Sequence, residues 1–191
     1  MHTCSLQQGP IQLNGNFIRI HRSSDQAIQR VSGYFIAEHP SFSSAVHWHI
    51  GEHVGHYIIP FGNINQSYIP LSITHQSGDL GVVSTSTYAT TPENTPLPSF
   101  PSSVGPLSLD LVDQIRHAVD RFWLVQTTEP SAQVILSFRF AQEEQPQIEN
   151  PLNAYSFEPM LSEWKVSDCC PLYQPELHTL SVQTTLANSC W

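Results

Sequence analysis

The chain has 191 residues and a formal net charge of −9, with 40% hydrophobic and only 12% charged residues. Seven lysines and arginines stand against sixteen acidic residues, which argues against a basic face that binds nucleic-acid phosphates. No apolar run approaches the roughly 20 residues needed to cross a bilayer. The first eight residues also lack the basic and apolar regions of a secretory signal. We therefore expect a globular protein without a membrane span, intracellular or associated with a particle.

The first half of the chain is typical of short strands separated by turns. Residues 10–13 and 16–20 flank Asn14-Gly15, a dipeptide that suits the tight turn of a β-hairpin because both positions tolerate a positive φ. Further apolar and β-branched runs predict strands at residues 31–38, 44–50, 56–61, 67–75 and 81–87. Strands at a spacing of about ten residues favour a sandwich or a barrel.

Residues 89–106 interrupt this pattern with five prolines among serine, threonine and asparagine. Proline cannot donate to a strand ladder, so we expect an extended connecting segment. The segment either crosses one face of a single domain, residues 1–191, or joins two parts, residues 1–88 and 107–191.

An amphipathic helix is predicted over about residues 108–124. Ser108 is a favourable N-cap, Asp110 and Asp113 lie early, and Arg121 lies late, as the helix dipole prefers. Apolar residues recur at three- and four-residue spacing: Leu111, Val112, Ile115, Val119 and Phe122.

The clearest strand of the sequence is predicted over residues 132–140, where Val134, Leu136, Phe138 and Phe140 occupy every second position and point to one face. A short strand is predicted at 164–167 and a closing strand at 178–186. Together these elements predict a mainly β protein, an antiparallel β-sandwich or jelly-roll, with one amphipathic helix.

A histidine-rich segment between residues 47 and 56 offers the chemistry of a metal site. On a strand, His47 and His49 share one face, with Cα atoms about 6.6 Å apart, and the turn at Gly51 could bring Glu52 or His53 to the same ion. Two histidines and one carboxylate suit catalytic zinc or Fe(II), with His21 and His75 as more distant ligands. The alternatives are structural or interfacial histidines, which need no cofactor, and acid–base catalysis without a metal.

Three functions remain open from the sequence. The first is a non-catalytic structural or interaction subunit of a larger assembly, such as a virion-type or filament-type particle, whose partners are copies of itself or other protein subunits. Its charge-poor surface suits interfaces, where charged residues are depleted. The second is a metal-dependent β-barrel enzyme using His47, His49, Glu52 and His53. The third is a carbohydrate- or peptide-binding module in which Trp48 or Trp164 stacks on a ligand.

Overall fold

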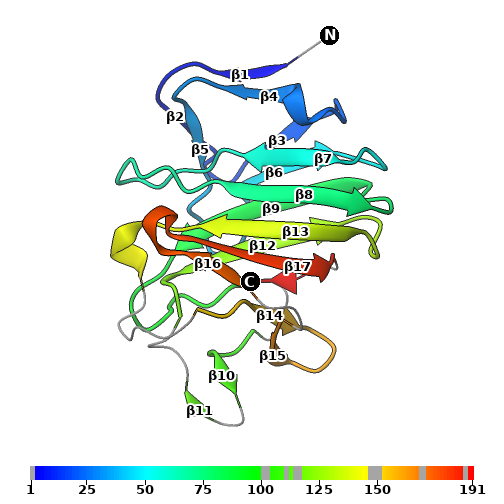
Figure 1. The fold of residues 1–191 in the computed structure, drawn as a ribbon. Coiled ribbons are helices and arrows are strands. Elements are labelled where there is room, and N and C mark those ends of the chain that lie inside the picture. Colours follow the sequence, from blue (N-terminus) through cyan, green and yellow to red (C-terminus); the bar gives the residue numbers. More distant parts are fainter. Residues whose placement is uncertain are drawn as a thin grey trace.

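The computed structural model describes residues 3–99, 104–109, 112–113, 118–145, 152–167, 171–186 and 189–191. Two sheets lie face to face and carry most of the strands (Figure 1). The protein is mainly β with multiple antiparallel sheets, and its described residues contain no helix of seven or more residues. Within the same residues, no helix has the length and apolar character to cross a membrane.

The larger sheet has seven strands, which run in the spatial order β15 (Glu163–Val166), β14 (Tyr155–Glu158), β18 (Ser189–Cys190), β12 (Arg121–Thr127), β9 (Val82–Ala89), β6 (Ala45–His49) and β3 (Phe17–Ile20). All neighbours are antiparallel except β3 and β6, which are parallel. The second sheet is fully antiparallel, in the order β16 (Leu172–Gln174), β17 (Thr179–Thr185), β13 (Gln133–Arg139), β8 (Leu71–Ser77) and β7 (Gly55–Ile59).

Three two-stranded ladders and three short 3-10 turns complete the described elements. The ladders pair β1 (Cys4–Leu6) with β4 (Ile28–Arg30), β2 (Pro10–Gln12) with β5 (Tyr34–Ile36), and β10 (Ser108–Leu109) with β11 (Val112–Asp113). The turns are η1 (Asp25–Ala27), η3 (Gln142–Glu144) and η4 (Pro175–Leu177).

The core forms where the two sheets meet, because each strand turns alternate side chains inward. On β13, the buried side chains Val134, Leu136 and Phe138 alternate with half-buried neighbours. They join the buried residues Val46 and Trp48 of the opposite sheet in one apolar cluster. The alternation that predicted this strand from the sequence is therefore confirmed.

The helix expected over residues 108–124 is not present in the described part of that range. Ser108–Leu109 and Val112–Asp113 are strands β10 and β11, and Arg121–Thr127 is strand β12; residues 110–111 and 114–117 lie outside the described residues. β12 pairs along its whole length with β9. Long-range pairing therefore overrides the local three- and four-residue pattern.

Burial on both faces explains why β12 did not resemble a strand in the sequence. Trp123 and Val125 face the cluster between the sheets, whereas Phe122 and Leu124 face a second cluster with Tyr88 and other aromatic residues. A strand that is apolar on both faces loses the alternation that identifies half-buried strands.

The predicted hairpin around Asn14-Gly15 is wrong, although the turn itself is confirmed. Asn14 and Gly15 have φ angles of 48° and 80°. The flanking strands do not pair with each other, because β2 pairs with β5 and β3 pairs with β6, both in parallel. The turn therefore carries the chain from one ladder to another.

Candidate functional site

The histidine-rich segment lies on β6 and the turn that follows it. Val46 and Trp48 point into the core, so His47 and His49 share the outer face of the seven-stranded sheet, as the sequence predicted. His47 Nδ1 is hydrogen-bonded to Ser84 Oγ of β9 at 2.5 Å. Burial and, after it, the positive charge of Arg19 lower the pKa of His47.

The structure brings together only part of the predicted metal-ligand set. His47 and His49 line an outer groove of about 450 Å³ with His21 and Arg19, whereas Glu52 and His53 are exposed on the turn. No group of three or more His, Cys, Asp or Glu side chains in the described residues is placed to hold one metal ion. A metal at His47, His49, Glu52 and His53 therefore stays a prediction.

Two other residues from the sequence prediction have structural roles in the core. His75 is fully buried, and its Nδ1 lies 2.8 Å from the backbone oxygen of His53. Trp48 is 1% exposed and its indole N–H donates to the Arg22 carbonyl at 2.9 Å. Trp48 is thus an anchor between the sheets and has no free ring face for a ligand.

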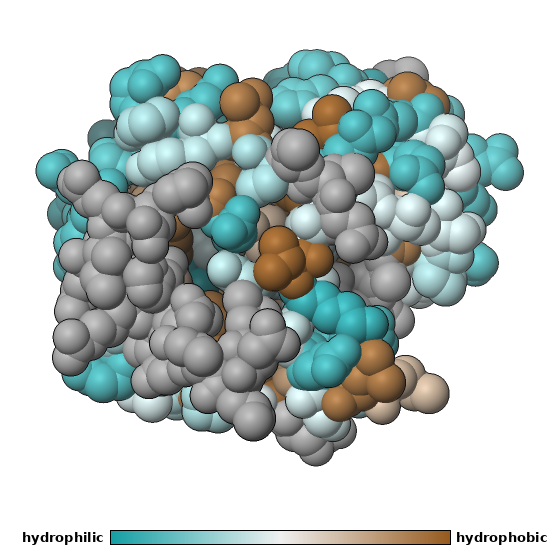
Figure 2. Space-filling model, turned by 60° about the horizontal axis from the view of Figure 1, so that its bottom comes forward, coloured by the Kyte–Doolittle hydropathy of each residue, from teal (hydrophilic) through white to brown (hydrophobic). Residues whose placement is uncertain are grey.

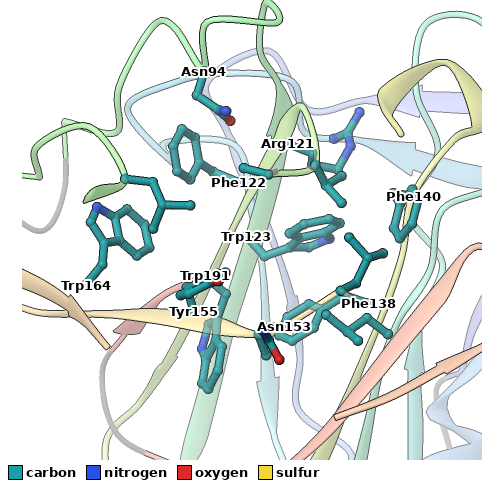
Figure 3. A pocket seen from close by; sticks show the side chains of 16 residues that line it. Asn94, Arg121, Phe122, Trp123, Phe138, Phe140, Asn153, Tyr155, Trp164 and Trp191 are labelled. Atoms are coloured by element: carbon teal, nitrogen blue, oxygen red, sulfur yellow. The ribbon is translucent and has the colours of Figure 1, made fainter. Parts of the chain in front are cut away.

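A pocket with aromatic walls lies at the other end of the sandwich, between β12 and β13, and residues of both apolar clusters line it. Its volume is about 80 Å³. Its labelled aromatic residues surround the cavity in Figure 3: Phe122, Trp123, Phe138, Phe140, Tyr155, Trp164 and Trp191. Seen from this end, the coloured part of the surface mixes apolar and polar side chains (Figure 2).

Strand pairing assembles this pocket from distant parts of the chain. Trp123 of β12 and Trp191, directly after β18, exchange two backbone hydrogen bonds of 2.8 Å. Phe138 of the opposite sheet lies against both rings, at centroid distances of 5.2 Å and 5.6 Å. Trp164 of β15 stacks on Phe122, with ring centroids 5.9 Å apart.

Two indole N–H groups of the pocket are buried without a hydrogen-bond partner among the described residues. They belong to Trp123, which is 5% exposed, and Trp191, which is 9% exposed. A buried donor without an acceptor costs free energy, and buried tryptophans usually find a partner. Both tryptophans line the pocket, whose wall is mostly apolar and also includes Asn94, Arg121 and Asn153.

A buried ion-pair network lies beside the pocket, and Arg121 is the member of it that lines the pocket wall. The Arg121 guanidinium has no exposed side-chain surface and binds Glu144 at 2.6 Å and Glu38 at 2.8 Å. The same guanidinium donates to Thr87 Oγ1 at 3.1 Å. Burial and, after it, the charges of Glu144 and Glu93 raise the pKa of the adjacent Asp120 to about 6. The network carries more carboxylates than cations.

Sequence reasoning named Trp164 but did not find the pocket. The strands that meet there are neighbours only through long-range pairing, so no spacing in the sequence joins Trp123 to Trp191 or to Phe138. No protein-family model, curated protein or solved structure matches this chain. The function is therefore argued from the pocket itself.

Proposed function

We propose that this chain is a non-catalytic ligand-binding module that holds a small apolar group of its ligand in the pocket between the sheets. The observation that carries the proposal is the aromatic pocket with two buried, unpartnered indole donors. Ligand pockets in proteins combine apolar and aromatic walls with a few placed polar groups. Of the carbohydrate and peptide alternatives, the mostly apolar wall favours a peptide side chain or a similar group.

The size of the pocket supports a compact group. An apolar cavity of about 150 Å³ can bind benzene, and this pocket has about 80 Å³. A branched aliphatic group fits such a volume better than an aromatic ring. The remainder of the ligand then lies outside the pocket, because the cavity is partly open.

Tryptophan fluorescence tests this function directly, because Trp123, Trp164 and Trp191 line the pocket while Trp48 lies outside it. N-acetylleucinamide, a neutral model of a leucine residue, should change the emission saturably. Methyl α-glucoside, a model sugar, should not. If the sugar alone is effective, the carbohydrate alternative replaces the peptide one, and if neither probe acts, the function is wrong.

A pocket-filling variant makes the test specific. Ala118→Leu extends a half-buried side chain of the pocket wall and should abolish the change in emission. The matched control Ala89→Leu adds the same group at an exposed position outside this pocket and should leave binding intact. Equal binding by both variants would contradict this location of the site.

We also propose, as a second candidate function, the structural or interaction subunit expected from the sequence. The observation that favours it is the turn between β14 and β15 at the edge of the seven-stranded sheet. Met160 is 90% exposed and Leu161 is 57% exposed there. Apolar side chains at the edge of a sheet favour contact with another chain, so a subunit that assembles with its own copies should form oligomers in solution.

A further inference from the structure

The two unpartnered indoles form a matched pair on neighbouring strands. Trp123 and Trp191 exchange both of their backbone hydrogen bonds, and directly opposed residues of an antiparallel ladder project to the same face. Both side chains therefore enter the space between the sheets, where Phe138 contacts each ring. Figure 3 shows Trp123 and Trp191 on the wall of the same cavity.

The indole N–H groups of the two other tryptophans, Trp48 and Trp164, have hydrogen-bond acceptors within the chain. The Trp48 N–H donates to the Arg22 carbonyl and the Trp164 N–H to the Gly105 carbonyl, each at 2.9 Å. Of the four indole N–H groups, those of Trp123 and Trp191 are the two that are buried without an acceptor among the described residues. A ligand atom that accepts from these donors would recover the cost of their desolvation.

The charges beside the pocket select against an anionic acceptor. Arg121 is the pocket's charged lining residue, and its guanidinium is already bound to Glu38 and Glu144. The backbone N–H of Asp120, which adds a further carboxyl group, donates to the carbonyl of Glu144 at 2.9 Å. A buried ligand carboxylate would meet this excess of negative charge without a free cation to pair with.

We propose that the ligand is a neutral amide, and that its carbonyl oxygen accepts a hydrogen bond from Trp123 or Trp191 while an adjacent branched aliphatic group fills the cavity. This inference rests on the proposed binding function and names the class of its ligand. The backbone of a peptide beside an aliphatic residue presents this combination. Trp123 and Trp191 are then specificity residues, because their N–H groups select a ligand with a hydrogen-bond acceptor. The aromatic wall selects for the shape of the aliphatic group.

Nuclear magnetic resonance of the indole N–H groups tests the inference on the intact chain. The probes are 3-methylbutanamide and 3-methylbutanoate, which have the same shape and differ in charge. The amide should move the Trp123 and Trp191 proton signals downfield and saturably, with Trp48 and Trp164 as internal references. The carboxylate should bind about tenfold more weakly at neutral pH. Equal affinity for the two probes, or shifts confined to the reference signals, would overturn the inference.

Two variants distinguish the contribution of the indole N–H to binding from that of the aromatic ring. Trp191→Phe removes one N–H but keeps an aromatic wall, and should weaken amide binding about three- to tenfold. Trp164→Phe makes the same change at a residue of the same pocket whose N–H is already bonded to Gly105, and should weaken it less. A larger effect at Trp164 would contradict the assignment of the donor.

Xenon distinguishes failure of this inference from failure of the proposed function, because it enters apolar cavities without needing a donor. If xenon perturbs the methyl signals of the pocket residues Leu152 and Leu180 while the amide leaves both indole signals unmoved, the amide inference is wrong and the binding pocket stands. If neither xenon nor the amide perturbs the pocket residues, both the amide inference and the proposed binding function are wrong.

Discussion

At the scale of single residues, Asp120 gives a pH-dependent prediction. Its pKa is raised from 3.8 to about 6, so the folded chain binds this proton more tightly than the unfolded chain does. The stabilisation is complete below about pH 4 and is lost as the pH rises through about 6. Asp120→Asn should therefore raise the melting temperature at pH 7.5 and leave it nearly unchanged at about pH 4. Glu52→Gln, which removes a charge from an exposed turn, is the control, and an equal gain from it would refute the prediction.

The buried guanidinium of Arg121 gives the second prediction at this scale. Arg121→Gln leaves the carboxylates of Glu38 and Glu144 without their cation, and should lower the free energy of unfolding by about 3–5 kcal/mol. Urea denaturation measures the loss. Adding Glu38→Gln and Glu144→Gln to this variant should recover part of it, since no unpaired charge is then left. No recovery would show that packing, and not charge, is responsible.

The same network shows what the sequence could not indicate about single residues. The positive charge of Arg121 suits the C-terminal end of a helix, so the sequence placed this residue in a helix. That placement was wrong. Its partner Glu38 lies 83 positions away and its partner Glu144 lies 23 positions away. Only the pairing of β12 in the sheet places them together, and no local pattern encodes such distances.

At the scale of elements, β13 allows a direct test of the core. Leu136 is fully buried between the sheets, whereas the neighbouring Ile135 is half-buried on the other face. Leu136→Ala should cost about 2–5 kcal/mol of unfolding free energy, because it leaves a cavity in a packed core. Ile135→Ala is the matched control and should cost clearly less in the same urea titration. The reverse order would contradict the assignment of the inner face.

The alternation of buried and accessible side chains along a strand explains which elements were predicted well from the sequence. β13, β17 and β8 each have one face in the core and one more accessible face, so their period of two is visible in the residues. β12 is buried on both faces and has no such period, and it was predicted as part of a helix. Parallel pairing of β2 and β3 with other strands likewise leaves no local signal, so a hairpin was expected instead.

At the scale of the whole molecule, the fold class was predictable and the candidate site was not. Turn residues and strand spacing indicate a β-sandwich, because these are local properties. The outer position of His47 and His49 was also correct, since it follows from alternation on one strand. The pocket instead depends on the order of the strands within the two sheets. Its two donors, Trp123 and Trp191, become neighbours only through the pairing of their strand segments.

Self-association is the property of the whole molecule that the edge of the seven-stranded sheet predicts. Met160 and Leu161 expose apolar surface beside β15, the outermost strand of that sheet. Burying this surface against another copy would be favourable, since apolar area removed from water contributes roughly 25 cal/mol per Å². Sedimentation should therefore give a mass above the 21.4 kDa of one chain.

A double variant locates the contact responsible for that mass. Met160→Ser with Leu161→Ser should return the mass to 21.4 kDa. Ile64→Ser removes an apolar side chain that is 76% exposed elsewhere, and should leave the oligomer intact. A wild-type chain that sediments as a monomer at every concentration would rule out assembly from copies of this chain. Because the pocket and this turn use different residues, fluorescence with N-acetylleucinamide in the double variant should still show binding.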